Sequence, residues 1–143
     1  MTMNLSVRFT VTAALALLAV VGCDLSTGPS PSNEFAWSVV ENAAEARDAM
    51  DAAAFAGDVN ILGQLTTPTL CYNLASNFIR NGASLTLRVT ANSSSATNCD
   101  QSAGGLRYTA VFRNAGRGEH PLLVVHSVPG FPDREYTDTL TID

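Results

Sequence analysis

Apolar and polar residues alternate along several segments of the chain, most regularly between Ser84 and Thr90. There Leu85, Leu87 and Val89 fall on one side, and hydroxyl and arginine side chains fall on the other. This period of two is typical of a strand with one face buried and one face in water. The preceding segment alternates as well, with one face formed by Tyr72, Leu74, Ser76 and Phe78.

A turn signal separates these two segments. Asn81-Gly82 tolerates the positive φ angles that a type I′ turn requires at both of its central positions. The sequence therefore predicts a β-hairpin around this dipeptide. Ile79 would point outward in that hairpin, a flaw that a bulge near the turn would absorb.

Four more segments read as strands, separated by turn signals such as the NAGRGE stretch. A continuous apolar run near His126 suits a central strand that is covered on both faces. Gly63 lies inside the first of the four and predicts a bulge. About six strands in residues 57–143 indicate a mainly β domain, a small antiparallel β-sandwich that is immunoglobulin-like or transthyretin-like. The four segments are residues 58–66, 106–113, 121–128 and 136–142.

Residues 34–56 differ in composition from the strands that follow. Alanine, glutamate and methionine favour helix, and Ser32 or Asn33 is suited to cap its first turn. We expect one short helix here, with its acidic residues on a solvated face. A cation site is the alternative for these acids, although neither His nor Cys accompanies them: Glu34, Glu41, Glu45, Asp48 and Asp51.

The N-terminus has the layout of a secretory signal. A short stretch with one basic residue, Arg8, is followed by an apolar run that ends at Cys23. The four residues Val20-Val21-Gly22-Cys23 resemble the lipobox of bacterial lipoprotein precursors. The resemblance covers the first two dozen residues and no more.

The resemblance implies that residues 1–22 are a lipoprotein signal peptide and that Cys23 is acylated after cleavage. Residues 23–33, rich in Ser and Pro, would be a flexible tether. The protein would then be anchored by lipid in the cell membrane or outer membrane, facing the periplasm or the cell exterior. Asp24 resembles an inner-membrane retention signal, but some lineages do not follow that rule. The sequence therefore does not decide between the two membranes. An ordinary cleaved signal or an uncleaved span is the alternative.

If Cys23 carries lipid, the two other cysteines are Cys71 and Cys99. An oxidising compartment would join them as a disulfide that closes the hairpin segment. Metal binding or redox chemistry is the alternative, but the C-x-x-C spacing typical of such sites does not occur here.

Charge excludes some classes of partner. Residues 23–58 hold seven acids and one arginine, whereas residues 59–143 hold six of each, and the chain has no lysine. A basic patch for nucleic acid or anionic lipid is therefore not expected.

Catalytic and cofactor motifs do not stand out. His120 and His126 would lie on one side of the same strand, roughly 20 Å apart, which is too far to share a metal. Neither a G-x-S-x-G elbow nor a phosphate-binding glycine motif occurs. We expect no enzyme activity, no cofactor and no metal.

Two surfaces are candidate binding sites. The first is an outward sheet face with Arg88, Arg107 and Arg113, which would suit an anionic glycan or an acidic protein; an ordinary charged face is the alternative. The second is the loop around Phe131, whose ring would either anchor a partner or tuck under the sandwich.

The sequence thus predicts a lipid-anchored, non-catalytic structural or interaction module of the cell envelope, with an envelope protein or glycan as partner. The alternative is a small inhibitor or ligand carrier that acts through its loops or a cavity. An envelope hydrolase ranks below both.

Overall fold

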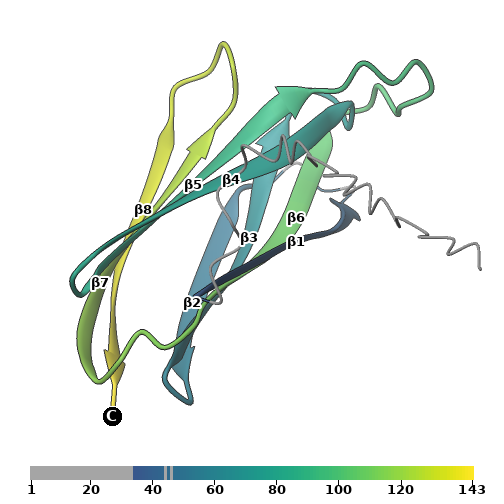
Figure 1. Ribbon diagram of the computed structural model, residues 1–143. Coiled ribbons are helices and arrows are strands. Elements are labelled where there is room, and N and C mark those ends of the chain that lie inside the picture. The colour runs from purple at the N-terminus through teal and green to yellow at the C-terminus, as the bar shows by residue number, and fades with distance from the viewer. Residues whose placement is uncertain (1–33, 44, 46) are drawn as a thin grey trace, which may run out of the picture.

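The computed structural model describes residues 34–143, apart from residues 44 and 46. In this part of the chain eight strands form two sheets that pack face to face, so the predicted β-sandwich is confirmed (Figure 1). Sheet A has the order β1-β6-β3-β2, and sheet B has the order β4-β5-β7-β8. The strands are β1 Phe35–Ala43, β2 Ala49–Phe55, β3 Asp58–Thr67, β4 Tyr72–Asn81, β5 Ser84–Ser93, β6 Gly104–Phe112, β7 Gly118–Ser127 and β8 Arg134–Ile142.

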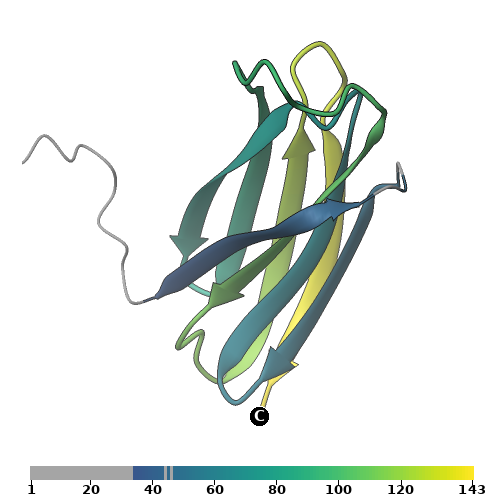
Figure 2. The same ribbon diagram turned by 90° about the vertical axis from the view of Figure 1, so that its right-hand side faces the viewer.

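The two ends of the sandwich differ, and we name them by their connections. The hairpin end carries the turns at residues 56–57 and 82–83 and the 113–117 connection, and β1 begins there. The loop end carries the 44–48, 68–71, 94–103 and 128–133 connections. In Figure 2 the hairpin end is at the bottom, beside the C-terminus, and the loop end is at the top.

The helix expected over residues 34–56 is wrong, because this segment forms β1 and β2. Helix propensity is overridden by aromatic packing and strand pairing. The Phe35 ring stacks on that of Phe78 with centroids 5.0 Å apart, and Trp37 stacks on Tyr108 at 4.9 Å. In β2 the partly buried and exposed positions alternate along AMDAAAF, so small alanines line an edge of the core.

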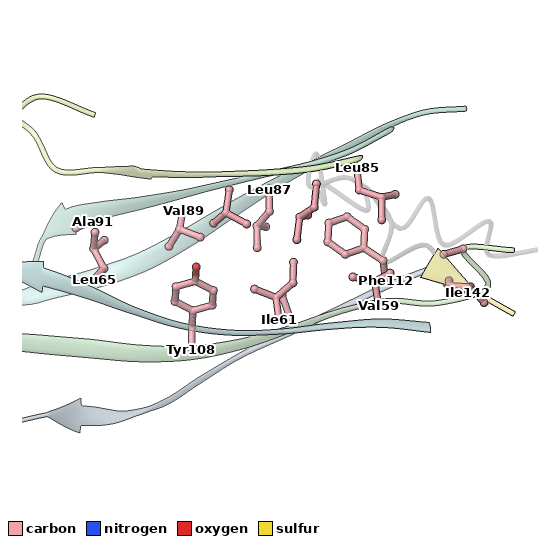
Figure 3. Packing of buried hydrophobic residues seen from close by; sticks show 14 of the residues in the cluster. Val59, Ile61, Leu65, Leu85, Leu87, Val89, Ala91, Tyr108, Phe112 and Ile142 are labelled. Atoms are coloured by element: carbon pink, nitrogen blue, oxygen red, sulfur yellow. The ribbon is translucent and has the colours of Figure 1, made fainter. Parts of the chain in front are cut away.

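Buried residues of both sheets meet in one core (Figure 3). The inward residues predicted for β5 are buried, and β6 buries every second residue in the same way. The bulge predicted at Gly63 is wrong, since β3 pairs without a register shift on both sides. Gly63 instead leaves room for the ring of Tyr108, its partner on β6, which a Cβ would overlap. The inward residues of β5 and β6 are Leu85, Leu87, Val89, Leu106, Tyr108, Ala110 and Phe112.

The β4–β5 hairpin is confirmed, with its turn one residue later than expected. Asn81 pairs with Ser84, so the central residues are Gly82 and Ala83. Gly82 has a φ of 60° and Ala83 does not share the positive sign, which fits a type II′ turn with glycine first. Ile79 is exposed as predicted, but no bulge accompanies it because the register is continuous.

The strand order contains one feature that the sequence did not predict. β5 and β7 are hydrogen-bonded in parallel at the centre of sheet B, whereas every other pair of described strands is antiparallel. The chain leaves β5, forms β6 in sheet A and returns as β7. The order differs from the ABED and CFG sheets of an immunoglobulin constant domain, so the likeness lies in the two-layer architecture.

The predicted signal peptide, Cys23 and the tether lie outside the described residues. Within residues 34–143 no helix has the length and hydrophobicity that crossing a membrane requires.

Candidate binding sites

Cys71 and Cys99 form a disulfide at the loop end, which confirms the predicted pairing. Their Cα atoms are 5.2 Å apart. The backbone N–H of Ser94 also donates to the carbonyl of Cys71 at 2.8 Å. The open ends of β4 and β5 are therefore held covalently and by a hydrogen bond. In the same loop Ser102 donates its N–H and hydroxyl to Asp100, which lowers the pKa of that carboxyl.

The three arginines predicted to share one face do not lie together. Arg88 is on β5 in sheet B, where its guanidinium donates to the Asp133 carboxylate at 2.8 Å and lowers the pKa of that acid. Arg107 is on β6 in sheet A, and its Nε donates to the side-chain oxygen of Gln64 at 3.0 Å. Arg113 follows β6 and is exposed. The proposed arginine surface for an anionic partner is thus split between two sheets.

Phe131 lies at the loop end and is 51% exposed, so its ring is neither free nor fully tucked under the sandwich. Its N–H donates to the carbonyl of Val128 at 3.0 Å, which closes a turn after β7. The ring forms one wall of a pocket of about 200 Å³, which we call the Phe131 pocket. Its walls also include Leu65, Pro68, His126, Val128, Pro132 and Arg134.

His126 is only 1% exposed and points across the core toward sheet A. Its Nε2 lies 2.6 Å from the hydroxyl of Tyr108, and its ring is 5.0 Å from that of Tyr136. Burial lowers the pKa of His126 to about 4 and raises the pKa of Tyr108, with Tyr136 adding to the latter shift. The Nδ1 atom has no hydrogen-bond partner among the described residues. Among the described residues, only one of its two nitrogens therefore has a partner.

His120 is also buried, at 3% exposure, on the same inward side of β7. Its Nδ1 is 3.0 Å from the carbonyl oxygen of Ala83, and its Nε2 is 3.0 Å from that of Gly116. Both nitrogens therefore face backbone acceptors and tie two turns together. The two histidines have separate partners, and residues 34–143, gaps aside, contain no group of three His, Cys, Asp or Glu placed to hold a metal.

A groove on the outer face of sheet A was missed by the sequence reasoning. It has a volume of about 470 Å³, and its lining includes the aliphatic residues Val40 and Leu62. Leu62 is 61% exposed and Val40 is 56% exposed, although both belong to strands. Four charged residues also line this site, which we call the outer groove. They are Glu45, Arg47, Asp51 and Arg107.

The outer groove had a signal in the sequence. In the segment VNILGQL the residues Val59, Ile61 and Leu65 are in phase and buried, whereas Leu62 is out of phase and points to solvent. The groove residues of β1 and β2 could not be predicted in the same way, because this segment was predicted to be a helix.

Comparison with known proteins leaves the function to be argued from these sites. No family model matches the chain, and neither the curated proteins nor the solved structures contain a significant match.

Proposed function

We propose that this chain is a lipid-anchored cell-envelope protein whose sandwich is a non-catalytic interaction module, and that the outer groove docks a segment of another envelope protein. The observation that carries the proposal is the exposure of Leu62 on β3 and Val40 on β1, which line the same groove. Apolar side chains gathered in one exposed site often mark a protein–protein contact.

The chemistry of the groove favours a protein segment over a glycan. Its lining combines the aliphatic side chains of Val40 and Leu62 with two acids and two arginines, so its formal charge is balanced. Protein–protein interfaces likewise combine apolar contact with polar groups. A glycan or an acidic partner would instead need arginines gathered on one face, and Arg88 and Arg107 lie on different sheets.

The anchor rests on the lipobox-like residues that end at Cys23. Residues 24–33 would span at most about 35 Å when extended. Because β1 begins at the hairpin end, this tether would join the sandwich there. The loop end, with the disulfide and the Phe131 pocket, would then point away from the membrane.

The surroundings of the histidines support a non-catalytic reading. A general base needs an orienting partner and access to a substrate. The described contacts of His120 are two backbone carbonyls, and those of His126 are aromatic residues in the core. Neither ring is bonded to a carboxylate or a serine in the part of the chain that the structure describes.

A photo-crosslinking experiment in cells that export the full chain tests the proposal. We expect Leu62→benzoylphenylalanine to give a discrete crosslink to another envelope protein. The matched control is Ile79→benzoylphenylalanine, which places the same group at an exposed apolar position on sheet B and should give no such product. Equal crosslinking from both positions, or none from position 62, would contradict the docking role.

The same cells test the anchor. The parent chain should incorporate a fatty-acid label and sediment with membranes, whereas Cys23→Ala should do neither. A Cys23→Ala chain that still carries label in the membrane fraction would overturn the lipid anchor and leave the crosslinking result standing.

A further inference from the structure

The most exposed large apolar residue in the described part of the chain lies at the hairpin end. Phe55 is the last residue of β2 and is 76% exposed. The turn that follows it, Ala56-Gly57, carries no charged side chain. A single exposed ring is common on protein surfaces, so its surroundings decide what it can bind.

Hydrogen bonds join the turn after Phe55 to the point where the tether would enter the sandwich. The N–H of Ala115 donates to the carbonyl of Gly57 at 2.9 Å, and the N–H of Arg113 donates to the carbonyl of Glu34 at 2.7 Å. Glu34 is the first described residue and directly precedes β1. The 113–117 connection therefore bonds to the turn beside Phe55 and also to the residue at which the tether would end.

The tether is long enough to bring this end of the sandwich to the membrane. β2 is the third strand from β1 in sheet A, so roughly 15 Å separates the two strands. Residues 24–33 would reach at most about 35 Å from a lipid on Cys23. Because the anchor would hold the ring at a high effective concentration beside the bilayer, one weak apolar contact is enough to orient the domain.

The charges at the hairpin end do not select a lipid by its net charge. Arg113 and Arg117 are exposed in the 113–117 connection, and Arg80 donates to the carbonyls of Asn114 and Ala115. Guanidinium groups bond well to phosphate, which every phospholipid carries. Acids at the same end offset these arginines, so we expect no long-range attraction to anionic lipid. They are Glu34, Asp58, Glu119 and Asp143.

We infer that the hairpin end rests on the lipid surface, with the Phe55 ring inserted at the boundary between the headgroups and the acyl chains. The inference rests on the proposed lipid anchor and adds which end of the sandwich contacts the membrane and through which side chain. The outer groove stays open to a protein partner, because Glu45 and Arg47 in its lining belong to a connection at the loop end.

Photo-crosslinking to lipid tests this contact. The full chain with Phe55→benzoylphenylalanine is purified from the cells that export it and reconstituted in phosphatidylcholine vesicles. We expect a phospholipid adduct, detected by mass spectrometry. The matched control is Phe131→benzoylphenylalanine, which places the same group at an exposed phenylalanine of the loop end and should give at least tenfold less adduct. Addition of anionic phosphatidylglycerol should change the yield at position 55 less than twofold.

A fatty-acid label on the same preparation separates this inference from the anchor. A labelled chain without an adduct at position 55, or with equal adducts at both positions, would overturn the Phe55 contact and leave the anchor standing. An unlabelled chain without an adduct would overturn both, whereas an unlabelled chain with an adduct at position 55 alone would overturn only the anchor. An adduct that forms only with anionic lipid, or a crosslink from position 55 to a protein instead of lipid in the exporting cells, would also overturn the inference.

Discussion

The two ends of the sandwich are held together by different kinds of interaction. At the hairpin end the connections are short, and hydrogen bonds join one turn to another. The N–H of Ala115 donates to the carbonyl of Gly57 at 2.9 Å, and His120 joins Ala83 to Gly116, so three turns are tied to one another. At the loop end the connections are mostly longer and are fixed by covalent and ionic cross-links.

The cross-links include a disulfide and an ion pair that joins the two sheets. The disulfide joins Cys71 to Cys99, and Asp48 before β2 pairs with Arg134 at the start of β8. Asp48 also accepts a hydrogen bond from the N–H of Thr66 at 2.7 Å. The ion pair therefore connects the edge of sheet A to the edge of sheet B.

His120 and His126 show one consequence of this difference. They lie six positions apart on one face of β7, the first at the hairpin end and the second toward the loop end. The tight turns place carbonyl acceptors beside both nitrogens of His120, whereas one nitrogen of His126 has no hydrogen-bond partner among the described residues. We conclude that the short turns supply polar partners to a buried histidine more fully than the longer loops do.

The largest expected effect comes from removing the disulfide. The double variant Cys71→Ser, Cys99→Ser should lower the free energy of unfolding by about 3–4 kcal/mol, because a loop of this length loses much entropy when it is cross-linked in the unfolded chain. Urea unfolding measures this loss, and reduction of the parent chain should reproduce it. A loss under about 1 kcal/mol would mean that the loop end does not depend on its covalent restraint.

A smaller effect should appear in mild acid through His126. Its pKa is lowered to about 4 in the folded chain, so the unfolded chain binds a proton at higher pH than the folded one. The contribution of neutral His126 to the free energy of unfolding is fully present above about pH 6.5. It falls by roughly 1.4 kcal/mol per pH unit as the pH drops toward 4. We expect a loss of about 2 kcal/mol between pH 6.5 and pH 5 in urea unfolding.

The variant His126→Phe provides the control for the acid effect. The groups that face His126 are Tyr108 and Tyr136, and its register neighbour Arg134 is paired with Asp48. The carboxyls of Asp100 and Asp133 have lowered pKa values, so they contribute below this window. If the parent chain and the variant lose stability equally between pH 6.5 and pH 5, the assignment to His126 is wrong.

The smallest expected effect is an increase in the free energy of unfolding from a substitution at the hairpin end. Ala56 has a φ of 53°, a conformation in which its Cβ is crowded. Asparagine tolerates this region well, so Ala56→Asn should stabilise the chain by about 1 kcal/mol in urea unfolding. The matched control is Ala83→Asn in the other hairpin turn, where φ is not positive and no gain is expected. A similar gain at both positions would show that the backbone conformation is not the cause.

The sequence predicted those structural features that depend on residues close together in the chain. Alternation located β3 to β8, and even the outward direction of Ile79 was correct. The cysteine count led to the disulfide. These features follow from side-chain periodicity and simple chemistry, which are present in any short window of the chain.

The errors concern features that depend on distant parts of the chain. Alanine-rich segments such as AMDAAAF carry little contrast between their two faces, so composition suggested a helix where pairing with β3 makes a strand. In β1 the strand is supported by Phe35 and Trp37, which stack on aromatic rings of β4 and β6. Alternation also does not say which sheet a strand joins, and so Arg88 and Arg107 were placed together. The contact between Tyr108 and His126 crosses from one sheet to the other and has no local signal.

The parallel pairing of β5 with β7 sets the contact order of sheet B. Each half of this sheet is a hairpin of chain neighbours, β4 with β5 and β7 with β8. The junction between the halves instead pairs Leu85 with Leu122, across the whole of β6. Closing such a long loop costs entropy before any contact is gained. The strand pairing at the centre of sheet B therefore joins residues that are farther apart in the chain than those in either hairpin. It is also the most deeply buried part of the sheet.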